Sequence, residues 1–213
     1  MNSSADWAIL LPGDLVMTPR LRGQVAQARI IAADAGIRHA ALMPRAPQLW
    51  IGDFDSATPQ DLESFGHIPR QRHPADKDAT DGALAVQEAL RLGAREVLLL
   101  GAFGGSPAHV QAHMTQIAAL SADGITAMAT DGRDEAWGLA PGHHEFDLPP
   151  GTKFSLLGFS SLQGLSISGA KWPLRNADIP FGSTRTLSNV VTKRPLSIGL
   201  TSGTGLLIAS LCS

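Results

Sequence analysis

The chain has 213 residues, of which 44% are hydrophobic and 17% are charged. This composition is typical of a globular protein with a sizeable core and excludes a disordered chain, while the length allows one or two domains. The net charge is −2, from 17 Lys and Arg against 19 Asp and Glu. That balance gives no electrostatic reason to expect nucleic acid or an anionic membrane as a partner.

The only cysteine and the N-terminus both favour a cytoplasmic protein. Cys212 has no second cysteine with which to form a disulfide, which fits a reducing compartment. Residues 1–15 lack the basic start and the long apolar stretch of a signal peptide. No apolar run approaches the roughly 20 residues that cross a bilayer as a helix, so we expect no membrane contact.

The first part of the chain alternates short apolar runs with helical patterns. Thr58, Pro59 and Gly66, for example, are typical of the start and end of a helix. Such alternation indicates a mostly parallel, doubly wound α/β sheet. The patterns predict strands at 7–13, 30–36, 48–53, 96–105 and 124–131, and helices at 19–30, 58–66, 78–93 and 109–120.

After about residue 135 the pattern changes. Short alternating runs are interrupted by Gly, Pro and Ser, and no helical pattern is present. This is typical of a smaller antiparallel β domain, which we expect to be a sandwich, joined by a linker at 131–142. The sequence thus predicts an α/β domain at 1–135 and a β-sandwich domain at 136–213.

The motif GDFDS (52–56) places two acidic residues where a predicted strand ends. In an extended chain Asp53 and Asp55 point to one side and Phe54 to the other. The carboxyl end of a parallel strand is where open α/β sheets bind ligands, and paired carboxylates suit Mg²⁺. A solvated loop with a helix cap explains the same residues, and the motif alone does not decide between the two.

The segment PADKDATDG (74–82) gathers acidic residues at the start of a predicted helix. A capped helix explains the segment on its own, because acids are favoured near a helix N-terminus. One cap does not need three aspartates, however. We expect Asp81 to face the same crevice as Asp53 if this helix starts at a neighbouring strand end, and Lys77 to neutralise phosphate.

The segment GAFGGSPAH (101–109) joins a predicted strand to a helix. Glycines at such a junction let the backbone approach a phosphate or a flat base. The segment matches neither GxGxxG nor a Walker A loop. His109 and His113 have zinc-like spacing, but the sequence offers no convincing third ligand, so a phosphate contact by one of them is favoured over zinc.

Two short segments of the β domain carry side chains that suit a heterocyclic ligand. Trp172, in GAKWPL, is either a core residue or an exposed platform for stacking. Ser188 and Asn189 either hydrogen-bond a heterocycle or form a turn. The residues alone favour a core position for Trp172 and leave both alternatives open for Ser188 and Asn189.

Taken together, these segments resemble the thiamine pyrophosphokinase (thiamin diphosphokinase) family over residues 32–210. The resemblance rests on ADAG, GDFDS, DKDATD, GGSPAH, GAKW and LSN, in this order and at these spacings. It implies Mg²⁺-dependent transfer of a pyrophosphoryl group from ATP to the thiamine hydroxyl, which gives thiamine diphosphate and AMP. It also implies a homodimer whose active sites lie between the α/β domain of one subunit and the β domain of the other.

The resemblance also assigns roles to residues. Catalysis and metal binding fall to Asp53, Asp55 and Asp81, with Asp34 as a helper. Thiamine binding falls to Trp172, which would stack on the pyrimidine ring, and to Ser188 and Asn189, which would bond its polar edge. The nucleotide phosphates would be approached by Lys77, Thr80, Gly104, Gly105 and His109.

The chain departs from the family pattern at two places. Ser106 and Ala108 stand where the family has Arg and Asp, and Ala35 replaces the first glycine of an Asp-Gly-Gly turn. The acidic motifs are intact, so these departures bear on rate and nucleotide preference more than on the reaction class.

Two other functions stay open. Another Mg²⁺-dependent phosphate-transfer enzyme is one, because DFDSAT loosely resembles the DxDx[TV] of haloacid-dehalogenase-type phosphatases, although Ala57 stands at the Thr or Val position. A non-catalytic thiamine- or nucleotide-binding homologue is the other, and the substituted GGSPAH segment is its support.

Overall fold

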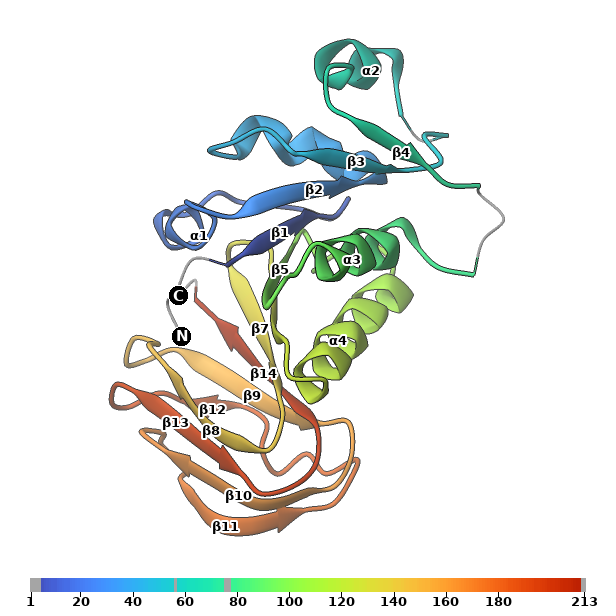
Figure 1. Cartoon of the computed structure of the whole chain (residues 1–213). Helices are drawn as coiled ribbons and strands as arrows, with labels where there is room; N and C mark the ends of the chain where they lie inside the picture. Colours follow the sequence, from blue (N-terminus) through green and yellow to red (C-terminus); the bar gives the residue numbers. More distant parts are fainter. Residues whose placement is uncertain (1–4, 56, 75–77, 212–213) are drawn as a thin grey trace. The chain divides into compact units, whose positions relative to one another are not determined.

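The computed structural model describes residues 5–55, 57–74 and 78–211. They form two compact units, which we name the α/β unit (5–110 and 129–132) and the sandwich unit (111–128 and 133–211). Figure 1 shows helices and strands interleaved in the first and almost only strands in the second. Cys212 lies outside the described residues.

The α/β unit is built on parallel strands. Neighbouring strands pair in the order β5-β1-β2-β3-β4, and all four pairings within this group are parallel. The strands are short, and apart from β4 they are mostly apolar. All four residues of β1 are buried, as expected for a strand covered on both faces. Their bounds are β1 (Trp7–Leu10), β2 (Arg29–Ala33), β3 (Leu49–Gly52), β4 (Arg70–Arg72), β5 (Glu96–Leu100) and β6 (Thr126–Thr130), whose last residues belong to this unit.

Helices of the α/β unit start at side-chain caps. The Thr18 and Thr80 hydroxyls accept the N–H groups of Leu21 and Ala83. A 3₁₀ helix, η1, and the helix α3 both pack against β1, β2 and β3. The bounds are α1 (Pro19–Gln24), η1 (Asp34–Leu42), α2 (Pro59–Phe65) and α3 (Asp81–Arg91), with α4 (Pro107–Ala122) beginning in this unit.

Several predicted boundaries in this unit are wrong. The strands expected at 7–13 and 96–105 end at Leu10 and Leu100, before the glycines that follow each of them. The helix expected at 19–30 ends at Gln24, because Ile30 and the residues after it form the buried strand β2. The strand expected at 30–36 ends at Ala33, and Asp34 begins η1. A Cβ on Gly36 would lie 2.2 Å from the Leu10 carbonyl oxygen, so only glycine lets η1 approach the end of β1 this closely.

The sandwich unit consists of two antiparallel sheets. One has the order β12-β9-β14-β7 and the other β11-β10-β13-β8. Phe146, Phe154, Leu165 and Leu207 belong to the hydrophobic core of this unit. The strands are β7 (Asp134–Leu139), β8 (Gly142–Phe146), β9 (Lys153–Gly158), β10 (Leu162–Ser168), β11 (Leu174–Ile179), β12 (Asn189–Val190), β13 (Leu196–Leu200) and β14 (Gly205–Ser210).

The linker predicted at 131–142 is also wrong, because it contains β7. This strand pairs antiparallel with β14 along its whole length, and Trp137 and Leu139 are buried. The strand begins with two acidic residues, Asp134 and Glu135, so the sequence does not indicate a buried strand here. The Glu135 side chain is nevertheless buried too. The fold class itself is confirmed: a mostly parallel α/β part precedes a smaller antiparallel β part.

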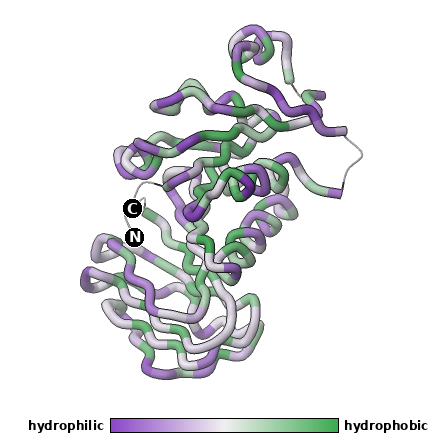
Figure 2. Tube along the Cα trace, viewed as in Figure 1, coloured by the Kyte–Doolittle hydropathy of each residue, from purple (hydrophilic) through white to green (hydrophobic). Residues whose placement is uncertain are grey.

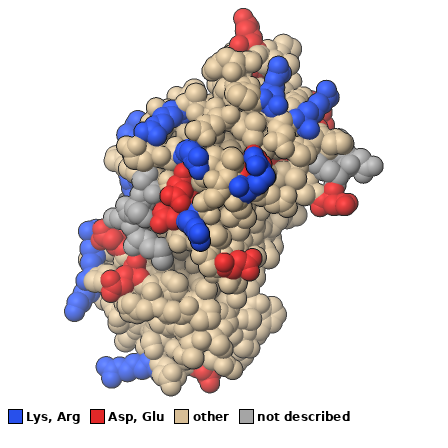
Figure 3. Space-filling model, viewed as in Figure 1, with Lys and Arg blue, Asp and Glu red and all other residues tan. Residues whose placement is uncertain are grey.

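Hydropathy and charge follow this architecture. Figure 2 shows hydrophobic residues along the central strands and hydrophilic ones mainly in loops and on helices. On the face shown in Figure 3, acidic and basic side chains are interspersed. Within the described residues, none of the helices combines the length and hydrophobicity that a membrane span requires.

Candidate active site

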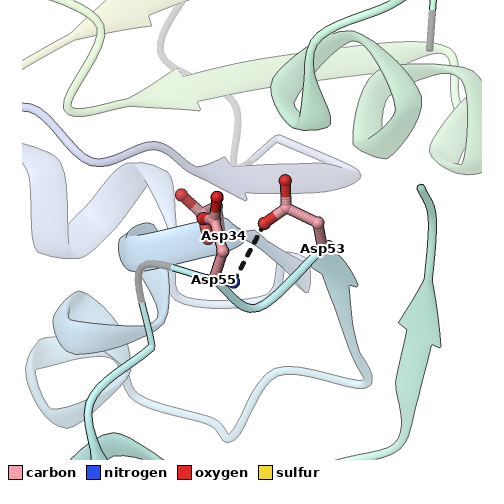
Figure 4. A group of neighbouring side chains, drawn as sticks. All are labelled: Asp34, Asp53 and Asp55. Atoms are coloured by element: carbon pink, nitrogen blue, oxygen red, sulfur yellow. Dashed lines mark hydrogen bonds between the residues drawn. The ribbon is translucent and has the colours of Figure 1, made fainter. Parts of the chain in front are cut away.

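Three carboxylates converge at the carboxyl ends of two neighbouring parallel strands (Figure 4). Asp34 follows β2, and Asp53 and Asp55 follow β3. One oxygen from each lies within 4.8 Å of the others, and all three side chains are at least partly accessible. We name these three residues the acidic cluster. Hard oxygen donors at this spacing fit a divalent cation such as Mg²⁺.

The aspartates of GDFDS converge by a route that differs from the predicted extended chain. Phe54 has φ +66°, a left-handed conformation that is costly for a bulky residue. The chain therefore turns at Phe54, and the Asp55 N–H donates to Asp53 Oδ1 at 3.0 Å. The prediction that the two carboxylates share a side holds, but a turn produces it and not strand alternation.

Trp50 supports the cluster from the core. Its indole Nε1–H donates to the Asp34 carbonyl oxygen at 2.9 Å, and its ring meets that of Phe54 edge-on with centroids 4.9 Å apart. Trp50 itself is fully buried in β3. One rigid side chain thus contacts both segments that carry the carboxylates. This role could not be predicted from the sequence, because a Trp in an apolar run indicates only burial.

The DKDATD segment is placed at the start of α3. Thr80 is the N-cap residue, and its hydroxyl accepts the Ala83 N–H at 3.2 Å. Asp81 is the first helical residue and lies outside the acidic cluster. Lys77 lies outside the described residues, so the phosphate contact expected of it stays a prediction.

The glycine segment connects β5 to α4 through left-handed residues. Gly104 and Gly105 have φ +90° and +73°, values that only glycine adopts without strain. Both are exposed, as is His109 in the first turn of α4. Ser106 and Ala108, the two departures from the family pattern, are exposed as well, so no buried contact depends on them.

A pocket of about 450 Å³ in the sandwich unit brings Trp172, Ser188 and Asn189 together. Trp172 is 53% exposed, so it is not a core residue. Ser188 has φ +58° and donates its N–H to Ser155 Oγ at 3.1 Å. The pocket is completed by residues that the sequence did not single out, namely Ile167, Leu174, Arg185, Thr186 and Leu187.

Asn189 holds the backbone of Trp172. Its Oδ1 accepts the N–H groups of Trp172 (3.1 Å) and Val190 (2.9 Å), and its Nδ2 donates to the Trp172 carbonyl oxygen at 2.8 Å. The side chain is 4% exposed. Because the described contacts occupy this amide, Asn189 is placed to orient Trp172.

Comparisons with known proteins agree with this architecture. The family model of the thiamin pyrophosphokinase catalytic domain matches residues 24–129, and that of its vitamin B1 binding domain matches residues 143–204. A thiamine pyrophosphokinase of Bacillus subtilis is 28% identical over 142 residues, which cover 65% of this chain and 66% of that protein.

Solved structures share the fold over nearly the whole chain. The thiamine pyrophosphokinase structure from Bacillus subtilis has a TM-score of 0.86 and 22% identity, covering 97% of this chain and 99% of the other. That from Geobacillus thermodenitrificans has a TM-score of 0.80 and 25% identity, covering 97% and 98%.

The fold and these matches define the class: a two-domain transferase of the kinase type. The chain belongs to the thiamin pyrophosphokinase family. This confirms the resemblance and the enzyme class predicted from the sequence, and it does not favour a non-catalytic homologue or a different phosphate-transfer enzyme.

Proposed function

We propose that this protein transfers the terminal diphosphate of ATP to the hydroxyl group of thiamine. The thiamine oxygen forms a bond to the β-phosphorus, the bond between that phosphorus and the α–β bridging oxygen breaks, AMP leaves, and the hydroxyl proton passes to a carboxylate of the site. The observation that carries the proposal is the convergence of Asp34, Asp53 and Asp55 at the strand ends.

The acidic cluster would hold Mg²⁺. The cluster offers carboxylate oxygens, the donors that this ion takes alongside phosphate oxygens and water. A bound Mg²⁺ neutralises phosphate charge and orients the groups that react, which is most of what phosphoryl transfer needs. Without a cation the three carboxylates repel one another, so the cluster makes chemical sense as a cation site.

Other residues of the α/β unit would hold the nucleotide. We assign phosphate contacts to Lys77 and Thr80 at the start of α3, and to the backbone of Gly104 and Gly105. Left-handed glycines without side chains let a phosphate approach the main chain closely. His109 is exposed beside them and can donate to an anion. Asp81 would complete the metal site through a water or a phosphate.

The pocket of the sandwich unit would hold thiamine. Trp172, which is 53% exposed, lines the pocket together with Ser188, and we assign its ring to stacking on the pyrimidine. Lys171 Nζ lies over the same ring, 4.7 Å from its centroid. Asn189 would act on the ligand mainly through Trp172, whose backbone it holds. We further propose a cytoplasmic homodimer in which one subunit's pocket meets the other's acidic cluster.

A product assay tests the function. Purified protein with ATP, Mg²⁺ and thiamine is expected to form AMP and thiamine diphosphate in equal amounts, measured by chromatography. Phosphate release without thiamine would indicate a phosphatase, and ligand binding without turnover would indicate a non-catalytic binding protein. Either result would overturn the proposal.

A further inference from the structure

An ion pair joins the two segments that carry the acidic cluster. Arg38 lies in η1, which begins at Asp34, and Asp61 lies in α2, which follows the loop containing Asp53 and Asp55. Arg38 Nη2 donates to Asp61 Oδ2 at 2.9 Å, and Arg38 Nε lies 3.3 and 3.2 Å from the two carboxylate oxygens. Because the guanidinium contacts the carboxylate through two N–H groups, the pair fixes the relative orientation of the two side chains as well as their distance.

Asp61 also fixes the end of the GDFDS loop. Its Oδ2 accepts the N–H and the hydroxyl of Thr58 at 2.9 and 2.8 Å, and its own N–H donates to Thr58 Oγ1 at 3.1 Å. Thr58 follows Asp55 by three residues. The Arg38 guanidinium, followed by these bonds from Thr58, lowers the pKa of Asp61 to about 2, so its carboxylate is charged at neutral pH.

The same ion pair sets the charge beside the cluster. Asp34 is close enough to Arg38 to contribute to the raised pKa of the guanidinium, after the larger contribution of Asp61. Arg38 therefore has two possible effects on a bound cation. It holds the segments in place, which favours binding, and its own positive charge opposes binding.

We propose that Arg38 and Asp61 are positioning residues that set the spacing of the acidic cluster for a divalent cation, with Thr58 as the link to the loop. The inference rests on the proposed metal-dependent function. Mutually repelling carboxylates stay at ligand spacing only if their segments are tied from outside, and this network ties one to the other.

A direct measurement of cation binding distinguishes a positioning role of Arg38 and Asp61 from a purely electrostatic role. A purely electrostatic role predicts tighter binding in Arg38→Met, which loses a positive charge, and weaker binding in Asp61→Asn. Positioning predicts weaker binding in both variants. Residues that orient metal ligands typically contribute about 10- to 100-fold to metal affinity, so we expect the Kd to rise at least about tenfold in each.

The experiment titrates Mn²⁺ into the full-length protein and follows free Mn²⁺ by electron paramagnetic resonance, with thermal unfolding measured on the same samples. Arg91→Met is the matched control, because it breaks the Arg91–Glu88 pair on α3, which is 2.7 Å long and lies outside the network. We expect its Kd to equal that of the wild type. Arg38→Lys keeps the charge but not the two-point contact, and should lie between wild type and Arg38→Met.

Three results would overturn the inference. They are unchanged or tighter Mn²⁺ binding in folded Arg38→Met, wild-type affinity in Asp61→Asn, and a Kd in Arg91→Met that rises as much as in Arg38→Met. If Arg38→Met does not fold, wild-type affinity in Arg38→Lys has the same consequence. Absence of Mn²⁺ binding by the wild type would instead remove the proposed metal site, and this inference with it.

Discussion

The acidic cluster and the sandwich pocket differ in charge, but both contain non-glycine residues with positive φ. Four described non-glycine residues have positive φ, and three of them lie here: Asp34 and Phe54 at the cluster, and Ser188 at the pocket. Such conformations persist only where the surrounding structure enforces them, and they concentrate at functional sites. Both regions are therefore held in shapes that the local sequence would not adopt by itself.

The two regions differ in the electrostatic repulsion that the surrounding residues must overcome. The cluster brings like charges together. Trp50 supports it from the core, and the Arg38–Asp61 ion pair joins the two segments that carry it. The pocket presents an uncharged ring that is about half exposed, and the buried Asn189 amide holds the backbone of that residue. Changes at the cluster should therefore act on turnover, and changes at the pocket on the affinity for one substrate.

The largest effect is expected for Asp53→Asn. The amide oxygen can still accept the Asp55 N–H, so the loop keeps its shape while one negative charge is lost. Metal ions contribute several kcal/mol to phosphoryl transfer, so kcat should fall at least about 100-fold, or about 2.7 kcal/mol. Steady-state kinetics with saturating ATP and thiamine measures this.

Its control is Asp123→Asn, an equally conservative change at an exposed position just after α4. Turnover and unfolding temperature should both match the wild type. Undiminished turnover in folded Asp53→Asn would contradict the metal assignment. It would also contradict the expectation that changes at the cluster act on turnover while changes at the pocket act on substrate affinity.

A smaller effect, confined to one substrate, is expected for Trp172→Ala. Loss of the stacking surface should raise the thiamine KM about tenfold, or about 1.4 kcal/mol, and leave the ATP KM nearly unchanged. Phe181→Ala is the control, since Phe181 is 69% exposed in the same unit but does not line the pocket. A thiamine KM equal to that of the wild type would show that the ring does not bind thiamine.

Asn189→Ala tests whether the amide acts through Trp172. The variant loses three hydrogen bonds of a buried group, which should lower the free energy of unfolding by about 1–3 kcal/mol. The thiamine KM should rise about threefold, less than in Trp172→Ala, because the ring remains but is less well oriented. In a double variant with Trp172→Ala, the KM should rise no further than in Trp172→Ala alone. Additive effects would mean that Asn189 contacts thiamine directly.

The sequence predicted those parts of the two regions that depend on local pattern. The apolar run before Asp53 marked a strand end, and the carboxyl ends of parallel strands are where open α/β sheets bind ligands. Thr58 was predicted as a helix cap, because capping spans only three residues. The residues alone favoured a core position for Trp172, which is wrong because the side chain is 53% exposed.

The supporting residues could not be predicted, because their partners are distant in the sequence. Arg38 and Asp61 are 23 residues apart, and Trp172 and Asn189 are 17 apart, with no periodicity that relates them. The turn at Phe54 was missed for another reason. Positive φ at a bulky residue contradicts local preference, and the contact of Phe54 with Trp50, which helps to support it, is tertiary.

The smallest effect is a pH dependence that arises at the side of the cluster. The Arg38 guanidinium lowers the pKa of Asp61 from its usual value near 3.8 to about 2. A lowered folded-state pKa means that the stabilisation is complete above the unfolded-state value and is lost as the pH falls through the folded-state value. The wild type should therefore exceed Asp61→Asn in free energy of unfolding at pH 7, and the difference should shrink between about pH 4 and pH 2.

Urea unfolding followed by circular dichroism at several pH values measures this difference. Asp147→Asn is the control, because its pair with Arg194 is 3.3 Å long and about half exposed on both sides. Solvent screens such a pair, so this variant should match the wild type at every pH. A gap between wild type and Asp61→Asn that stays constant down to pH 2 would mean that Asp61 stabilises the loop by neutral hydrogen bonds alone. The cluster would then be held as the pocket is, and the contrast between charged and uncharged support would fail.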